Sequence, residues 1–201
     1  MKKRLQTIFR EGTMKKLCLL LALCLAFTGC LFGCGKSGEE ESGAAQEDAK
    51  GEVVDVGEFT VVVPEGWMKY PQTDVFGEAD ADGNTPLRTD AYGMIKDGKS
   101  EIDAFSKPTV YVYYYDEAGA EEQASFNTAF YDENTPIELT VNGQAVIANE
   151  SKMDDWVYQV VFIPVTENSC FQVTIPLDID GVGTSYEDAD VMTIMESLQV
   201  K

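Results

Sequence analysis

Alternating apolar and polar residues from about residue 53 onward predict a domain built mainly of β-strands. The pair Asn142-Gly143 stands between two such runs, and two-residue hairpin turns of type I′ prefer this pair. The sequence therefore predicts a β-hairpin over 137–149. Pro64 and Gly66 end the first strand, because both residues interrupt regular pairing. The remaining strands are expected over 59–67, 89–96, 108–116, 155–163 and 169–177.

Two segments have helical rather than alternating patterns. Residues 118–130 contain helix formers and place Phe126 and Phe130 four positions apart, on one helical face. In residues 185–200, Ser185 and Asp188 have the spacing of a capping box, and four apolar residues follow at helical spacing: Val191, Ile194, Met195 and Leu198. We therefore expect an α+β fold, with helices packed on a mostly antiparallel sheet.

The N-terminal part has the layout of a secretory signal. Two lysines follow Met14, an apolar run covers 17–27, and a small residue precedes Cys30. Because this signal is complete without residues 1–13, we interpret 1–13 as an extension that precedes the true start. The signal peptide is predicted to cover 1–29.

The end of this segment resembles the lipobox of bacterial lipoproteins. Phe27-Thr28-Gly29-Cys30 is similar to that motif, although Phe27 replaces the usual Leu. The resemblance implies transfer of a diacylglyceryl group to the thiol of Cys30 and cleavage on its amino side. Two acyl chains anchor a protein stably. Leu31-Phe32-Gly33-Cys34 is a second candidate, in which a bulky Phe occupies a position for a small residue.

An uncleaved membrane anchor is the alternative interpretation, because residues 17–35 carry no charge over a length that can span a bilayer. Secretion with cleavage elsewhere is a further alternative. Residues 35–52 are rich in Gly, Ser, Ala and Glu and predict a linker. The expected layout is an anchor at residue 30, a linker to residue 52, and a domain over 53–201 on the extracytoplasmic face of the membrane.

The start of the domain resembles PsbP-like and DcrB-like domains. A strand that runs into Pro64-Glu65-Gly66-Trp67 is similar to the opening of these domains, and so is the amphipathic closing helix around Ile194 and Leu198. The resemblance implies an α-β-α sandwich over 53–201. It carries no catalytic residues, and it implies a binding or accessory role.

Charge and composition exclude several classes of function. The chain has a net charge of −20, and the part after Cys34 holds 9 basic and 34 acidic residues, so we expect no binding to nucleic acid. There is no histidine, which removes the commonest general base and transition-metal ligand. Cys170 stands alone in the domain, so neither a disulfide framework nor a zinc site is expected, and no cofactor is predicted.

Residues 78–84 contain a candidate metal site. Glu78, Asp80 and Asp82 alternate before Gly83, which is similar to the start of a calcium-binding loop. However, Thr89 stands where such a loop needs a bidentate Glu. The simpler interpretation is a solvated acidic turn.

The strongest candidate for a binding face is a row of aromatic residues. Tyr111, Tyr113 and Tyr115 alternate along one strand and share one face of the sheet, where they could stack on a sugar or grip a peptide. The loop at Trp67 is grouped with this row as a second contact. The competing interpretation is that these aromatic residues pack in the core. Cys170 is expected to be an inert buried thiol.

We therefore expect a non-enzymatic binding or accessory module that a lipid anchors to the membrane and that meets an extracytoplasmic protein or glycan. Two alternatives remain open. One is a hydrolase of glycans that uses a pair of carboxylates. The other is a calcium-dependent adhesion module that uses residues 78–84.

Overall fold

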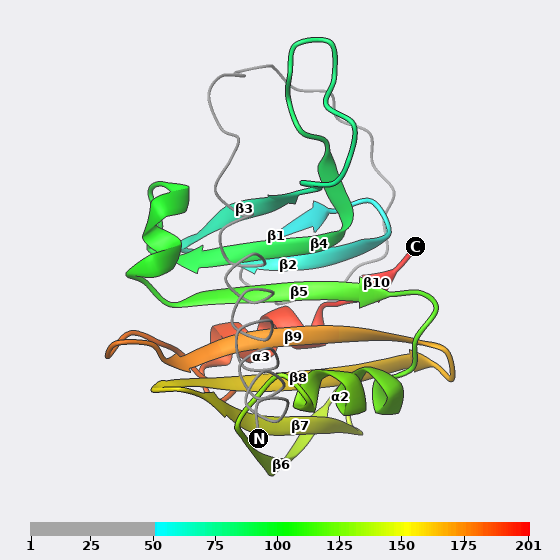
Figure 1. The fold of residues 1–201 in the computed structure, drawn as a ribbon, viewed down its shortest axis with the longest axis vertical. Helices are drawn as coiled ribbons and strands as arrows, with labels where there is room; N and C mark the ends of the chain where they lie inside the picture. The colour runs from blue at the N-terminus through cyan, green and yellow to red at the C-terminus, as the bar shows by residue number, and fades with distance from the viewer. Residues whose placement is uncertain (1–50) are drawn as a thin grey trace, which may run out of the picture. The chain divides into compact units, whose positions relative to one another are not determined.

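The computed structural model describes residues 51–201 (Figure 1). The signal segment, Cys30, Cys34 and most of the predicted linker lie outside the described residues. The described chain belongs to two compact units, of which one includes residues 73–87 and the other residues 51–72 and 88–201.

Strands dominate the described chain. They are β1 (Gly51–Asp55), β2 (Phe59–Pro64), β3 (Trp67–Thr73), β4 (Leu87–Lys96), β5 (Thr109–Tyr115), β6 (Glu133–Val141), β7 (Gln144–Met153), β8 (Trp156–Thr166), β9 (Ser169–Asp178) and β10 (Gln199–Val200). The helical segments are the 3-10 helix η2 (Glu101–Phe105), α2 (Ala120–Thr128) and α3 (Ala189–Glu196).

The strands form two sheets. One has seven strands in the order β3-β4-β5-β9-β8-β7-β6, and the other has three in the order β1-β2-β10. The pairings of β4 through β9 run antiparallel, as do those of β2 with β1 and β10. The prediction of a mostly antiparallel α+β fold is thereby confirmed.

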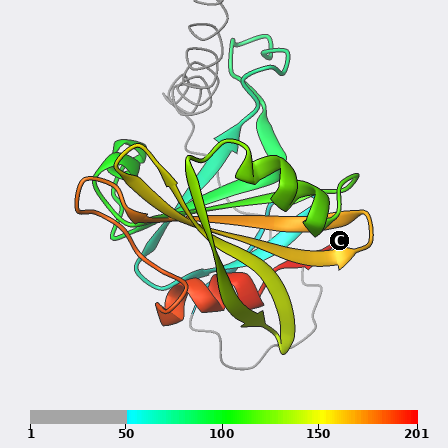
Figure 2. The same ribbon diagram turned by 60° about the horizontal axis from the view of Figure 1, so that its bottom comes forward.

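The two helices cover opposite faces of the seven-stranded sheet. Val160 of β8 belongs to the cluster that contains Ala120 and Ala124 of α2, whereas Val161 belongs to the cluster of α3. Successive residues of a strand point to opposite faces, so the two clusters lie on either side of the sheet. Figure 2 shows α2 and α3 on these two sides.

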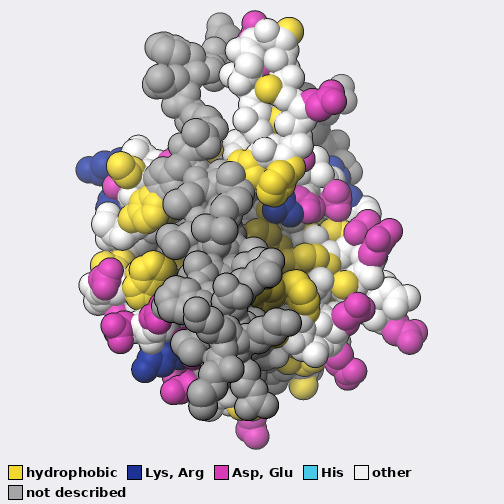
Figure 3. Space-filling view, viewed as in Figure 1, with side chains coloured by type: hydrophobic (Ala, Val, Ile, Leu, Met, Phe, Trp, Pro, Cys, Tyr) yellow, Lys and Arg dark blue, Asp and Glu magenta, His cyan; other side chains and the backbone are white. Residues whose placement is uncertain are grey.

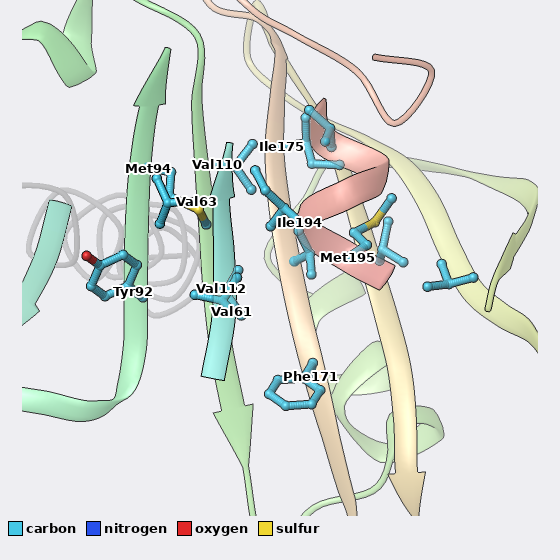
Figure 4. Packing of buried hydrophobic residues seen from close by; sticks show 14 of the residues in the cluster. Val61, Val63, Tyr92, Met94, Val110, Val112, Phe171, Ile175, Ile194 and Met195 are labelled. Atoms are coloured by element: carbon cyan, nitrogen blue, oxygen red, sulfur yellow. The ribbon is translucent and has the colours of Figure 1, made fainter. Parts of the chain in front are cut away.

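The main core lies on the α3 side. Ile194 and Met195 of α3 are at most 1% exposed and pack with Ile175 of β9 and Phe171 (Figure 4). Strand β2 closes this core with Phe59, Val61 and Val63, which alternate along the strand and therefore share the side that faces the core.

The hairpin predicted at Asn142-Gly143 is confirmed. Strands β6 and β7 pair with each other, and the pair closest to the turn is Val141 with Gln144. Between them, Asn142 and Gly143 have φ angles of 50° and 76°. Positive φ at both central residues defines the type I′ turn. The hairpin is longer than predicted, because β6 begins at Glu133 and includes Pro136. A proline is tolerated there because β6 is an edge strand.

Three predicted segments differ in the structure. Pro64 and Gly66 end β2 as expected, but the chain turns at Glu65-Gly66 and continues as β3, a strand that the sequence pattern did not predict. The linker was predicted to extend to residue 52, but Gly51 pairs with Pro64. The first strand, β1, therefore begins at Gly51, inside the predicted linker. The helix predicted over 185–200 is shorter in the structure and covers only α3. The last two residues of the predicted segment, Gln199 and Val200, form strand β10, which pairs with β2.

The capping box predicted at Ser185 is wrong. The N-cap of α3 is Asp188, whose carboxylate accepts a hydrogen bond of 2.9 Å from the backbone N–H of Asp190. Ser185 precedes the helix, and its hydroxyl accepts from the N–H of Glu187. An aspartate in this position stabilises a helix through its unpaired N–H groups.

Candidate functional site

The predicted row of tyrosines lies on the face of β5 that points away from the main core. Val110 and Val112 of β5 belong to the core on the α3 side, and Tyr111, Tyr113 and Tyr115 alternate with them. All three tyrosines are half-buried. The row therefore occupies the same face of the sheet as α2.

Three further tyrosines join this row from other parts of the chain. The ring of Tyr70 in β3 lies 6.3 Å from the ring of Tyr111, and the ring of Tyr131, after α2, lies 5.8 Å from that of Tyr158 in β8. The hydroxyl of Tyr111 interacts electrostatically with that of Tyr158. Six of the nine tyrosines thus gather on one face, and we name this group the tyrosine face: Tyr70, Tyr111, Tyr113, Tyr115, Tyr131 and Tyr158.

Helix α2 covers one side of this face. Tyr115, Tyr131 and Tyr158 pack at its border, in the cluster that contains Ala120 and Ala124. For these three side chains, the interpretation as core packing is thus partly correct. Figure 3 shows this side of the molecule, where apolar side chains lie between scattered acidic ones.

An ion pair adds polar groups to the tyrosine face. Nε and Nη2 of Arg88 donate hydrogen bonds of 2.8 and 2.6 Å to the two carboxylate oxygens of Asp90. The guanidinium carbon of Arg88 lies 5.8 Å from the centre of the Tyr113 ring, within the range of a cation–π contact. The hydrogen bonds to Asp90 raise the pKa of Arg88, and those from Arg88 lower the pKa of Asp90. Both side chains are therefore charged at neutral pH.

Side-chain amide and hydroxyl groups continue the polar border. The hydroxyl of Tyr115 donates to Oε1 of Gln172 over 3.4 Å, and Nε2 of Gln172 donates to the hydroxyl of Thr174 over 3.1 Å. Both partners lie on β9, directly opposite β5 in the register. The face therefore combines aromatic rings with groups that donate and accept hydrogen bonds.

Burial keeps the tyrosine hydroxyls protonated. It raises the pKa of Tyr115 and of Tyr158 to about 12, and it raises the pKa of Tyr111, Tyr113 and Tyr131 as well. For Tyr113, the nearby Arg88 opposes the effect of burial without cancelling it. Each hydroxyl can therefore both donate and accept a hydrogen bond at neutral pH.

Trp67, which was predicted to lie with the tyrosine row, lies in the main core on the other side of the sheet. Its side chain is 7% exposed and clusters with Val110 and Val112. Its Nε1 donates a hydrogen bond of 3.0 Å to Asp190. The structure therefore separates Trp67 from the tyrosines and gives it a packing role.

The acidic residues 78–84 form a turn around Asp80. Oδ1 of Asp80 accepts from the backbone N–H groups of Asp82 and Asn84, at 2.9 and 2.8 Å, and Oδ2 accepts from the amide of Asn84 at 2.9 Å. These bonds lower the pKa of Asp80. Within residues 51–201, no group of three or more His, Cys, Asp or Glu side chains converges in a way that could hold a metal ion, so Glu78 and Asp82 do not complete a site with Asp80.

The described cysteine, Cys170, is fully buried in β9 beneath α2. Burial raises the pKa of its thiol to about 11, which disfavours the reactive thiolate. Within the described part of the chain, no helix is long and apolar enough to cross a membrane.

A hollow of about 400 Å³ lies where the chain enters the described domain, between β1 and the start of β3. Glu52 and Glu65 line it together with Lys69, which forms an ion pair of 2.5 Å with Glu52. A second hollow of about 220 Å³ is lined mainly by apolar residues beside α3 and β10. The tyrosine face contributes to neither.

Comparisons with known proteins identify no family. No model of a known protein family matches the chain, and no curated protein matches it. Among solved structures, it is similar to a protein of Bacteroides thetaiotaomicron determined by crystallography at 1.50 Å, with 11% identity and a TM-score of 0.42. The match covers 76% of this chain and 49% of the solved chain, so this chain spans about half of its neighbour.

Proposed function

We propose that this protein is an extracytoplasmic lipoprotein that Cys30 anchors to the membrane, and that its domain binds a partner protein through the tyrosine face. The role is that of a non-enzymatic binding or accessory module. The anchor rests on the signal-like segment and the lipobox-like residues that end at Cys30.

The gathering of six tyrosines on one face is the observation that carries the proposed binding role. Four of them are half-buried and can reach a partner, whereas Tyr70 and Tyr158 are buried and pack against the rings of Tyr111 and Tyr131. Tyrosine supplies a large, rigid contact area with a polar tip, and ordering it costs little conformational entropy. Tyrosine and arginine are also enriched among the residues that dominate binding energy in interfaces. Arg88 at the ring of Tyr113 adds such a residue to this face.

Charge favours a basic partner. The described residues include seven basic and 29 acidic side chains, a net charge of −22. Five of the seven basic side chains form ion pairs with acidic ones: Lys69, Arg88, Lys96, Lys107 and Lys201. The surplus of carboxylates would attract a basic surface and repel an acidic one, which increases both association rate and selectivity.

Site-specific photo-cross-linking in the native cell tests this proposal. Tyr113→p-benzoylphenylalanine places a photoreactive ring on the tyrosine face, and Phe126→p-benzoylphenylalanine is the matched control on the outer side of α2, where Phe126 is 62% exposed. We expect the Tyr113 position to give a discrete protein adduct that the control lacks, and Arg88→Ala to weaken it. An adduct to glycan alone, or identical products from both positions, would contradict a protein partner.

The PsbP-like relationship belongs to the same proposal. It is supported by the helices on opposite faces of the sheet and by the Pro64-Glu65-Gly66-Trp67 segment, which joins β2 to β3. In such a domain, the central sheet is a rigid scaffold, and the binding groups lie on its uncovered part.

A further inference from the structure

Two apolar side chains project from the connection between β4 and β5. Ile102 is 67% exposed and Phe105 is 52% exposed, and both lie on the short helix η2, in which no residue is buried. Exposing two large apolar side chains on one short turn is unfavourable in water unless another surface covers them.

The turn that carries this pair is held in place by hydrogen bonds. A carboxylate oxygen of Asp103 accepts from the backbone N–H groups of Lys99 and Ser100, at 2.7 and 3.2 Å. The ammonium group of Lys107 lies 3.6 Å from the same carboxylate and also donates to the backbone oxygen of Asp97. Helix η2 therefore presents Ile102 and Phe105 from a defined backbone.

Helix η2 lies at the end of the domain where the described chain begins. Gly51 pairs with Pro64, and Gly66, two residues later in the β2–β3 turn, accepts a hydrogen bond of 2.7 Å from the N–H of Asp97. Asp97 immediately precedes the turn that leads to η2. In Figure 1, strands β2 and β4 accordingly end toward the left of the picture, where the short helix η2 also lies.

The segment that carries η2 is less acidic than the domain as a whole. Residues 96–107 contain three lysines and three acidic residues and are neutral, whereas the described residues together carry −22. Near the chain entry, Lys69 adds a fourth basic side chain, beside the two acidic residues Glu52 and Glu65. A strongly acidic domain that is held beside an anionic bilayer meets less repulsion from this neutral segment than from its more acidic surfaces.

We propose that η2 is a membrane contact, in which Ile102 and Phe105 enter the interfacial region of the bilayer and Lys99 lies among the lipid headgroups. This inference rests on the proposed lipid anchor, whose tether joins the domain at Gly51. Apolar side chains beside lysines bind the interface through both buried apolar area and charge. The contact would orient the domain, so that the tyrosine face is presented at a fixed angle to the membrane.

Tryptophan fluorescence in vesicles tests the contact. The full chain is expressed in a bacterial host, purified from membranes, and reconstituted in equal parts of phosphatidylethanolamine and phosphatidylglycerol, with and without brominated acyl chains. The reporting variants are Ile102→Trp and Phe105→Trp. Phe126→Trp is the control on α2, which lies toward the opposite end of the strands from η2 in Figure 1. Wild-type spectra are subtracted to remove Trp67 and Trp156.

We expect the emission from Ile102→Trp and Phe105→Trp to shift to shorter wavelength and to be quenched by brominated lipid, whereas Phe126→Trp keeps the emission of a water-exposed indole. An anchored protein whose η2 variants emit like the control would overturn the membrane contact and leave the anchor intact. A protein recovered in the soluble fraction would overturn the anchor and, with it, this inference. Near-ultraviolet circular dichroism verifies that each variant is folded. Because Ile102→Trp and Phe105→Trp are separate variants, a folding failure of one leaves the other to test the contact.

Discussion

The indole N–H of Trp67 donates a hydrogen bond of 3.0 Å to Asp190, in the first turn of α3. Lys96, at the end of β4, lies 5.6 Å above the same indole ring and forms ion pairs of 2.8 and 3.3 Å with Asp188 and Asp190. The start of β3, the end of β4 and the start of α3 are therefore joined by one polar cluster at the edge of the main core.

Replacing Trp67 tests the strength of this junction. Trp67→Phe keeps an aromatic ring but removes the N–H, so we expect a loss of about 1–2 kcal/mol in the free energy of unfolding, because the bond is to a charged acceptor. A double-mutant cycle with Asp190→Ala isolates the pair by chemical denaturation. Additive effects of the two substitutions would show that the hydrogen bond does not contribute.

Acid should weaken the same junction. Burial raises the pKa of Asp188, but the hydrogen bond and charge of Lys96, together with the hydrogen bonds from the Asp190 N–H and the Thr184 hydroxyl, outweigh burial and leave the pKa below its usual value. A carboxylate with a lower pKa in the folded state stabilises the fold at neutral pH, and this contribution is lost as the pH falls through that pKa.

Asp188→Asn removes the charge while leaving a residue that can cap the helix. We expect it to cost about 1 kcal/mol at pH 7. The difference in Tm from the wild type should shrink as the pH falls below about 4. A difference that stays constant from pH 7 to pH 3 would contradict this account.

The closing helix should be essential to the core. Ile194 is fully buried between α3 and the sheet, so Ile194→Ala is expected to cost about 2–5 kcal/mol, through lost burial and the cavity that it leaves. Ile102→Ala is the matched control, because Ile102 is 67% exposed and its truncation should change stability by less than about 0.5 kcal/mol. Equal losses for both variants in urea denaturation would be inconsistent with the burial of Ile194.

The tyrosine face predicts a loss of stability in alkali. Burial raises the pKa of Tyr115 and Tyr158 to about 12, so the folded state holds these protons more tightly than the unfolded state. The resulting stabilisation is complete below about pH 10 and is lost as the pH rises towards 12. Ultraviolet absorbance should show these tyrosines ionising together with unfolding, whereas ionisation near pH 10 in a folded protein would contradict their burial.

Local patterns were sufficient to predict the parts of the fold that depend on neighbouring residues. Asn142-Gly143 specified its hairpin because positive φ at two successive positions is costly for most other residue pairs. Strand β3 was missed because Pro64 and Gly66 end one strand without indicating that another follows at once. Strand β10 was missed because Gln199 and Val200 are strand residues only through pairing with β2, a contact distant in sequence.

The candidate site was predictable only in part, for the same reason. Strict alternation placed Tyr111, Tyr113 and Tyr115 on one face, since side chains alternate along a strand. Tyr70 and Tyr158 come to this face only through the order of strands in the sheet, which no local pattern encodes. The separation of Trp67 from the row likewise follows from the turn at Gly66, where the chain passes between the two sheets.

The intact mass of the membrane-associated protein from a bacterial host tests the central claim most directly, with Cys30→Ala and Cys34→Ala beside the wild type. We predict a chain that begins at Cys30 and carries a diacylglyceryl group, the same product from Cys34→Ala, and no lipidated product from Cys30→Ala. An unprocessed, unlipidated chain in the membrane fraction would contradict the lipoprotein account and support an uncleaved apolar anchor instead.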